Sequence, residues 1–197
     1  MNNPEAYALL RKHVENFAGI PDRDWALLLP HLQIKKLRKH QFFAQEGKKA
    51  AEVGLVLEGM FRQYYTKDSE EKTTYFFFEN HFLSAYISCI TDKPSLITIE
   101  ALSDSVCVTF PYRILRQLFD KSLAWQKFGR LMAEYLTIGL EERMASLLLK
   151  SPEERYVDLL VGNKKKILER VPQHYIASYL GVTPVSLSRI RNRVLKK

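Results

Sequence analysis

Few cysteines, no long apolar run and no signal peptide set the first limits on this 197-residue sequence. Its two cysteines, Cys89 and Cys107, are too few for a disulfide-built scaffold or for an iron–sulfur cluster held by four thiolates. We expect both to be reduced and buried. No apolar stretch approaches the roughly 20 residues that a membrane-spanning helix needs, and Met1–Glu5 lacks the basic and then apolar layout of a signal peptide. We therefore expect a cytoplasmic protein that does not bind a membrane.

The sequence also lacks the motifs of an enzyme. Cupin-type metalloenzymes, which are small β-barrels, need clustered histidines, but the histidines here are scattered and form no ligand-spaced pair: His13, His31, His40, His81 and His174. A glycine-rich phosphate loop, a nucleophile elbow and a zinc motif are absent as well. We therefore expect no catalysis, no bound metal and no cofactor.

Positive charge is concentrated at one end of the chain. Residues 150–197 carry eleven Lys or Arg against four Asp or Glu, a balance of +7, whereas residues 1–149 carry nineteen against eighteen. A basic segment of this kind is typical of a module that binds a polyanion such as nucleic acid. A solvated basic face has the same composition, so the charge alone leaves both interpretations open.

The first part of the chain has the pattern of a small β-barrel preceded by helices. An apolar stripe and the break at Gly19–Pro21 predict two short helices within residues 5–29. Short β-branched and aromatic runs follow, separated by turn residues; they are 53–57, 61–66, 73–78, 96–101 and 106–110, with a polar turn at 67–72. We expect an antiparallel barrel of the jelly-roll type.

A long helix is predicted over residues 122–150, after a short one at 111–119 that begins at Pro111. Residues spaced three and four apart along it form a seam typical of a coiled coil, in which Glu142 is a polar member; the others are Phe128, Leu131, Tyr135, Ile138, Ala145 and Leu149. The seam predicts a homodimer, and a buried core helix of a monomer is the alternative. A second apolar stripe on another face would let the helix also pack on its own domain; it comprises Leu136, Leu140, Met144, Leu147 and Leu148.

Residues 151–154 separate this helix from a third segment. Ser151 can cap a new helix, Pro152 suits its first position, and acidic residues favour its first turn. We predict a helix over 153–162 that ends near Gly162–Asn163, and then a basic turn at Lys164–Lys166. The predicted domains are therefore 1–121, 122–150 and 151–197.

The most informative motif begins at Gln173. A first helix is predicted from Gln173 to Leu180, and Gly181 can adopt the left-handed conformation that ends a helix. Thr183 can cap a second helix, with Pro184 at its first position. Two helices joined by a three-residue turn, the second of them basic, form a helix-turn-helix, whose second helix lies in the major groove of DNA.

The outward faces of this motif identify the side chains that would contact DNA. Arginine can bind both acceptors of guanine, whereas other basic and polar groups position the phosphate backbone. The predicted DNA-binding residues are Gln173, His174, Thr183, Pro184, Val185, Ser186, Ser188, Arg189, Arg191 and Arg193. A basic helical hairpin that binds no nucleic acid is the alternative.

Taken together, the β-roll, the stretch Ile99–Ser105 near its end, the long helix and the helix-turn-helix resemble the Crp/Fnr family of transcription regulators. The resemblance covers nearly the whole chain. It implies an α+β protein with an N-terminal double-stranded β-helix (jelly-roll, cyclic nucleotide-binding-like) sensor domain, a parallel dimerisation helix and a C-terminal winged helix-turn-helix. It also implies a dimeric, sequence-specific regulator that binds pseudo-palindromic double-stranded DNA and, if it is an activator, RNA polymerase. Arg189 matches the family's recognition-helix arginine, and the other base-reading positions fall on Pro184, Val185 and Ser186.

Two departures from the family concern the effector. Members that bind cyclic nucleotides carry a Gly-Glu pair for the ribose and an Arg-Ser or Arg-Thr pair for the cyclic phosphate. The sequence around Ser84–Ala85 and Ser95–Leu96 has neither the glutamate nor the arginine. Oxygen-sensing members hold an iron–sulfur centre with a cysteine cluster that this chain lacks. We therefore expect neither cyclic AMP nor an iron–sulfur cluster to bind tightly.

The sequence does not identify another effector. Four aromatic residues of the predicted barrel could line an apolar ligand site, although such residues more often form a core: Phe76, Phe78, Phe82 and Tyr86. The alternative to a regulator is a β-roll sensor or interaction protein whose basic tail recognises no specific DNA.

Overall fold

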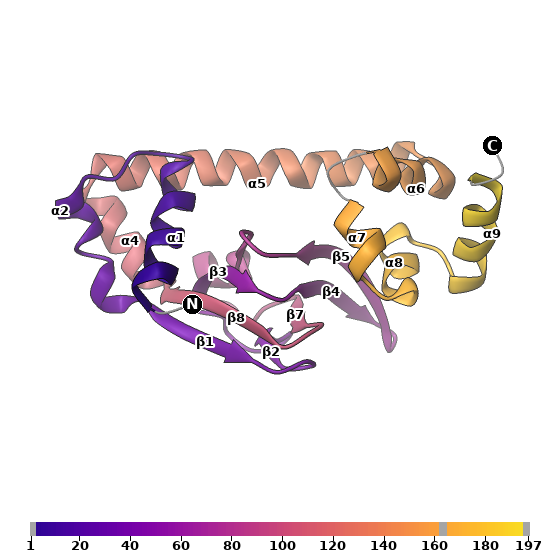
Figure 1. The fold of residues 1–197 in the computed structure, drawn as a ribbon, viewed down its shortest axis with the longest axis horizontal. Helices are drawn as coiled ribbons and strands as arrows, with labels where there is room; N and C mark the ends of the chain where they lie inside the picture. The colour runs from indigo at the N-terminus through magenta and orange to yellow at the C-terminus, as the bar shows by residue number, and fades with distance from the viewer. Residues whose placement is uncertain (1–2, 162–164, 195–197) are drawn as a thin grey trace. The chain divides into compact units, whose positions relative to one another are not determined.

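The structure, a computed structural model, describes residues 3–161 and 165–194 (Figure 1). Its elements fall into two compact units. One unit comprises the residues up to Gln63 together with Phe76–Leu136. The other comprises Tyr64–Tyr75 and the residues from Thr137 onward.

Helices open the chain and strands follow. The helices are α1 (Asn3–Glu15), α2 (Asp22–Trp25) and a 3-10 helix (Leu29–His31). The strands are β1 (Gln33–Leu37), β2 (Phe42–Ala44), β3 (Glu52–Glu58), β4 (Phe61–Lys67), β5 (Glu70–Phe77), β6 (Phe82–Leu83), β7 (Thr98–Ala101) and β8 (Ser105–Pro111), with helix α3 (Tyr86–Thr91) between β6 and β7. The two short N-terminal helices and the β-rich segment after them match the sequence-based expectation.

The strands form two four-stranded sheets, in the orders β1-β8-β3-β6 and β2-β7-β4-β5. In the first sheet, β8 lies between β1 and β3 and pairs antiparallel with both, so that Cys107 is opposite Lys35 on one side and Val56 on the other. The prediction of an antiparallel jelly-roll is confirmed.

The polar turn between β4 and β5 is shorter than the predicted 67–72. Only Asp68 and Ser69 form it, both with positive φ (52° and 64°), and β5 already begins at Glu70. A two-residue hairpin loop with two positive φ angles matches the twist of the strands beside it. Glu70–Lys72 therefore belong to a strand, where their polar side chains are exposed. Their polarity had suggested a loop.

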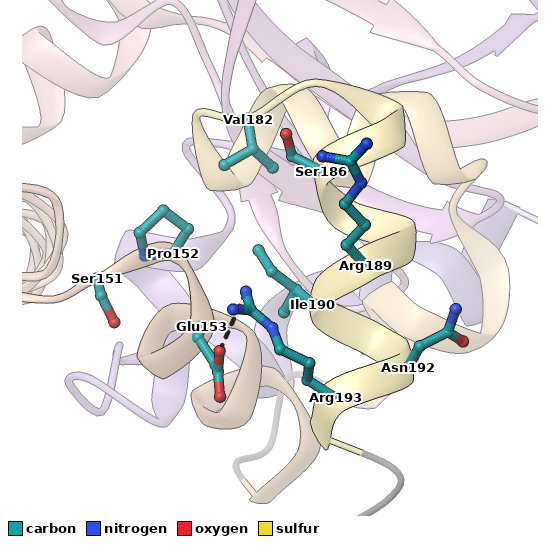
Figure 2. Close-up of a pocket in the computed structure, with 9 residues that line it drawn as sticks. All are labelled: Ser151, Pro152, Glu153, Val182, Ser186, Arg189, Ile190, Asn192 and Arg193. Atoms are coloured by element: carbon teal, nitrogen blue, oxygen red, sulfur yellow. Dashed lines mark ion pairs between the residues drawn. The ribbon is translucent and has the colours of Figure 1, made fainter.

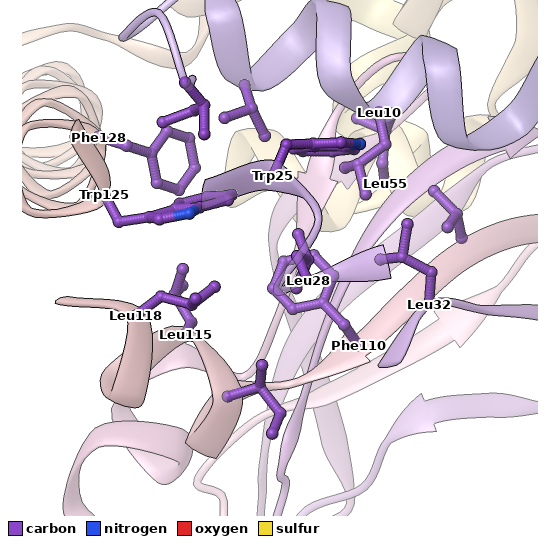
Figure 3. Packing of buried hydrophobic residues seen from close by; sticks show 14 of the residues in the cluster. Leu10, Trp25, Leu28, Leu32, Leu55, Phe110, Leu115, Leu118, Trp125 and Phe128 are labelled. Carbon is purple, nitrogen blue, oxygen red and sulfur yellow. The ribbon is translucent and has the colours of Figure 1, made fainter. Parts of the chain in front are cut away.

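The core of the first unit is rich in aromatic rings (Figure 3). Trp125 is fully buried and stacks on Trp25, with ring centroids 6.1 Å apart, while Phe128 meets Trp125 edge-on at 5.5 Å. A second apolar cluster draws on strands of both sheets and includes Phe61, Ile99 and Cys107. Burial of these side chains is the main force that holds the unit together.

Two helices close this part of the chain. Helix α4 (Tyr112–Lys121) begins directly after Pro111, as predicted, and α5 (Leu123–Leu149) follows it. Ser122 separates them because its backbone is extended and its Oγ accepts a hydrogen bond from the amide of Trp125 (3.3 Å), which caps α5.

Four further helices follow α5 in the second unit: α6 (Pro152–Val161), α7 (Lys165–Arg170), α8 (Gln173–Leu180) and α9 (Pro184–Val194). Ser151 caps α6 as predicted, since its Oγ accepts from the amide of Glu154 while the Glu154 carboxylate accepts from the amide of Ser151. The side chain of Ser151 and, after it, the backbone amide of Ser151 lower the pKa of Glu154 through hydrogen bonding. Between Pro152 and Val194, strands of a wing are not among the described elements.

The predicted basic turn at Lys164–Lys166 is wrong for its last two residues, which lie in α7. Ile167 and Val171, four residues apart, are both buried and anchor this short helix and its end. Six residues are too few to show a helical period in the sequence. Lys164 and the predicted helix end at Gly162–Asn163 lie outside the described residues.

Both cysteines are free and buried, as expected. Burial raises the pKa of Cys107 to about 12. Within residues 3–161 and 165–194, no helix has the length and apolar character needed to cross a membrane.

Candidate nucleic-acid interface

Helix α8 and the turn after it have the geometry predicted from the sequence. Ile176, Ala177 and Leu180 are completely buried on the inner face of α8. Gly181 adopts a left-handed conformation (φ 69°, ψ 32°). Its amide donates to the carbonyl of Ser178, and the next amide donates to Ala177, which is the hydrogen-bond pattern of a glycine-terminated helix. A residue with a Cβ would be strained at this φ.

Helix α9 begins at a side-chain cap. The hydroxyl of Thr183 accepts from the amide of Ser186 (3.2 Å) and donates to the Ser186 hydroxyl (3.0 Å), while Pro184 occupies the first helical position. Leu187 and Ile190 are buried and hold α9 against the rest of the unit. Opposite them, α9 has an exposed face.

The three arginines of α9 differ in how they are held. Arg191 donates to the side-chain oxygen of Gln173 on α8 (3.1 Å), and Arg193 forms an ion pair with Glu153 on α6 (3.3 Å). Arg189 is exposed and forms no ion pair or side-chain hydrogen bond with any described residue. Arg189 is therefore the arginine of this helix that is free to bind an external acceptor.

Arg189 also lines an open groove between the start of α6 and the exposed side of α9 (Figure 2). The groove has a volume of about 880 Å³ and is lined by Ser151, Pro152, Glu153, Val182, Ser186, Arg189, Ile190, Asn192 and Arg193. Its donors come from Arg189, Arg193, Asn192 and the two serines, beside apolar side chains and the Glu153 carboxylate. Such donors suit phosphate and base-edge acceptors.

The other predicted DNA contacts are also at the surface. Gln173, His174, Thr183, Pro184 and Ser188 are exposed, and Ser186 is half-buried. Val185 is 62% exposed, which leaves its methyl groups available to a partner. Gln173 and Arg191 lie on different helices yet bind each other, so the structure joins α8 and α9 across their outer side.

The predicted dimer seam on α5 is split between core and surface. Phe128 is 3% exposed and packs edge-on against Phe17 and Phe82, so it is a core residue of the first unit and is not available to a partner. Leu131 is half-buried. The other seam residues are exposed: Tyr135 by 58%, Ile138 by 59% and Leu149 by 82%, together with Ala145.

The second apolar stripe of α5 is exposed too. Leu140, Met144 and Leu148 are more than half exposed, and Leu136 and Leu147 more than a third. One helix with this many exposed apolar side chains is uncommon on a monomer, because water disfavours contiguous apolar surface. The distal part of α5 thus has the surface of an interaction helix.

The four aromatic residues suggested for an effector pocket are packed against protein. Phe76 and Phe78 are buried, Phe82 lies edge-on to Phe17 (6.4 Å), and Tyr86 lies edge-on to Tyr112 (5.8 Å). None of the four lines the groove beside α9. Their surroundings are those of core side chains.

Ser84 and Ser95 stand where the resemblance implies contacts with a cyclic nucleotide. The hydroxyl of Ser84 donates to the carbonyl of Glu52 (2.9 Å), and that of Ser95 donates to the carbonyl of Ile97 (2.7 Å) while accepting from its amide. Both hydroxyls are thus engaged by the chain itself. No positive side chain stands at either position, so these residues do not fit a cyclic phosphate.

Sequence reasoning missed a buried ion pair in the β-roll, between Arg62 and Glu100, which the exposed ring of His40 approaches from outside the core. Glu100, 9% exposed at its side chain, accepts from Arg62 (2.9 Å) and is 2.7 Å from the Nδ1 of His40. The three residues are up to 60 positions apart, so no local pattern could have revealed them. The sequence signal that existed was an arginine directly after Phe61 and a glutamate between Ile99 and Ala101.

Comparisons with known proteins agree with this architecture. Residues 34–122 match the family model of the cyclic nucleotide-binding domain. Comparison with curated proteins finds no significant match. Among solved structures, FixK2 from Bradyrhizobium japonicum is 18% identical with a TM-score of 0.69, over 84% of this chain and 85% of that one.

Two further structures share the fold. A protein from Eubacterium rectale assigned to the Crp/Fnr family is 21% identical with a TM-score of 0.68, over 90% of this chain and 85% of that one. The catabolite activator protein of Thermus thermophilus is 17% identical with a TM-score of 0.56, over 91% and 86%. The resemblance predicted from the sequence is therefore confirmed at the level of the fold: the chain has the fold of the Crp/Fnr regulators, and its residues 34–122 match the model of the cyclic nucleotide-binding domain.

Proposed function

We propose that this protein is a homodimeric, sequence-specific DNA-binding regulator of transcription. The observation that carries the proposal is the α8–turn–α9 motif, whose second helix is capped at Thr183, anchored by Leu187 and Ile190, and exposes Arg189 on its outer side. A helix of this kind fits the major groove, where its N-terminal residues meet base edges. Gln173, His174, Ser188, Arg191 and Arg193 would contact the backbone around it.

The exposed apolar surface of α5 supports the dimer. Two copies of the helix that pair along Tyr135, Ile138, Ala145 and Leu149 would bury side chains that are otherwise in water. Because a two-fold dimer presents the same helix twice, the DNA site would be a palindrome with half-sites about 34 Å apart. In this proposal residues 1–121 sense a signal, 122–150 pair the subunits and 151–197 bind DNA.

In this proposal cyclic AMP does not bind tightly, because the hydroxyls of Ser84 and Ser95 are engaged by backbone carbonyls and neither residue carries a positive charge. A small molecule or a protein contact would be the signal. As an activator the protein would also contact RNA polymerase.

Selection of duplexes from random DNA, followed by fluorescence titration of the selected and scrambled sequences, tests the proposal. We expect the selected duplex to bind at least about a thousandfold more tightly than the scrambled one. We also expect affinity to fall steeply with salt, since each phosphate contact releases counterions. Equal affinity for all sequences would instead support a β-roll protein with a non-selective basic tail.

Replacing Arg189 by Ala should cost about 1–3 kcal/mol of binding to the selected duplex and relax the preference at one base pair. The reason is that Arg189, alone among the arginines of α9, has no side-chain partner within the described residues, so its guanidinium can pair with a guanine. Titration against all four bases at each position measures the effect.

Arg193→Ala is the matched control for this variant, because Glu153 already holds that arginine. It should lower affinity for every sequence by a similar small factor. A uniform loss in the Arg189 variant, without a change in base preference, would make Arg189 a phosphate contact.

A further inference from the structure

A buried arginine joins two helix ends in the second unit. Arg155 lies on α6 and is 9% exposed. Its Nη1 donates to the carbonyl of Lys150 (2.6 Å), at the end of α5, with longer contacts to the carbonyls of Leu147 and Ser146 (3.4 and 3.5 Å). Its Nη2 donates to the carbonyl of Leu180, the last residue of α8 (2.8 Å). One guanidinium therefore bridges α5 and the helix-turn-helix.

The chemistry of helix ends explains why an arginine stands there. The last carbonyls of an α-helix have no intrahelical donor and carry a partial negative charge. Two such ends converge on Arg155, and no carboxylate among the described residues pairs with it. The planar guanidinium donates from separate nitrogens at fixed angles, whereas a lysine ammonium donates from a single nitrogen.

A second arginine, on α5, binds the neighbouring carbonyl of α8. Arg143, on α5, donates to the carbonyl of Tyr179 and stacks on its ring, with the guanidinium carbon 3.8 Å from the ring centroid. Tyr179 is itself buried. Burial, and secondarily the charge of Arg155, lower the pKa of Arg143. Arg143 and Arg155 thus hold the last two carbonyls of α8, at Tyr179 and Leu180.

These contacts differ in kind from the apolar packing elsewhere in the unit. Apolar surfaces permit small rotations at little cost, whereas hydrogen bonds weaken steeply as their angles depart from linearity. Together the two arginines fix the direction of α8, and with it α9, relative to the last turns of α5. The angle between these helices determines where each copy of α9 would point in a dimer that pairs through α5.

We propose that Arg155 and Arg143 are positioning residues that set the half-site spacing the dimer accepts. The proposal rests on the proposed function. One base pair added between half-sites turns one half-site by about 35° and moves it about 3.4 Å along the duplex. If the connection between α5 and α8 is rigid, the dimer binds one half-site spacing tightly. If the connection is loosened, the dimer binds several spacings, each with less affinity.

The experiment uses the full chain and a series of palindromic duplexes whose selected half-sites are separated by the selected spacing or by one or two base pairs more or fewer. A duplex with one half-site is included. For the unchanged protein, we expect about a tenfold loss of affinity at each non-selected spacing. For Arg155→Met, which keeps an unbranched side chain but removes the guanidinium donors, the spacing profile should flatten and the half-site affinity should stay within about twofold.

Arg155→Lys should resemble Arg155→Met, because an ammonium cannot span both helix ends. Arg23→Met, at an 87% exposed side chain of the first unit, is the control and should keep the sharp profile. Should Arg155→Met fail to fold by circular dichroism, Arg143→Gln carries the same test with the same expected flattening.

Two outcomes would overturn the proposal. In the first, the variants keep the spacing preference of the unchanged protein. In the second, they lose affinity equally for the full site and the half-site, as expected if the two arginines only stabilise the fold. Failure of the proposed function has a separate signature: the unchanged protein would bind no duplex selectively, and no spacing optimum would exist to compare.

Discussion

The Ile138→Lys variant should sediment as a monomer and bind its palindromic DNA at least about 100-fold more weakly than the unchanged protein, because the second half-site contact would no longer be intramolecular. Ile138 is 59% exposed near the middle of α5, with exposed Tyr135 one turn before it. At a two-fold seam the change would bring two ammonium groups together in an apolar contact, at a high desolvation cost.

Sedimentation velocity gives the oligomeric state, and titration with full-site and half-site duplexes gives the coupling between subunits. Half-site affinity should change little, since Ile138 is remote in sequence from α9. Ile138→Leu, which preserves the apolar contact, should remain a dimer. A lysine variant that still sediments as a dimer would remove Ile138 from the interface, and a monomer that binds the full site normally would show that pairing is not needed.

Replacing Trp125 by Ala should lower the free energy of unfolding by about 3–5 kcal/mol. Trp125 is fully buried, stacks on Trp25 and meets Phe128 edge-on, so its loss leaves a cavity bounded by both rings (Figure 3). Its indole nitrogen also donates to the carbonyl of Asp24 (3.3 Å), and this bond between α5 and α2 would disappear. Urea denaturation followed by far-ultraviolet circular dichroism measures the change.

Leu123→Ala is the comparison, two residues away on α5 and 82% exposed. It should change the unfolding free energy by less than about 0.5 kcal/mol. If the tryptophan variant lost no more than this, the stacked pair would not be a main element of the core.

The helix-turn-helix could be predicted residue by residue because its signals are local. Gly181 ends α8 and Thr183 begins α9 through bonds to atoms within a few positions of each, so the sequence itself contains both partners. The jelly-roll was predictable at a coarser level. Strand runs were visible, but the pairing of β1 with β8 joins residues about seventy positions apart, for which periodicity carries no information.

Along α5 the limit of sequence reasoning is of another kind. A spacing of three and four predicts which side chains share a face, but not what covers that face. Phe128 and Ile138 belong to one seam by spacing, yet the first packs into the aromatic core and the second is exposed. The bridges made by Arg155 and Arg62 were equally invisible, because their acceptors are backbone carbonyls or distant residues that only the fold brings near.

Val185 gives the exposed side of α9 two methyl groups where a polar side chain would be the more usual choice. In the major groove the apolar feature of a base pair is the C5 methyl of thymine. In the proposed complex with DNA, a helix that presents valine there would discriminate by shape and water exclusion, and it would treat a methylated cytosine much as it treats thymine. Chemical marking of cytosine in the operator would then change occupancy without any change in the Watson–Crick sequence.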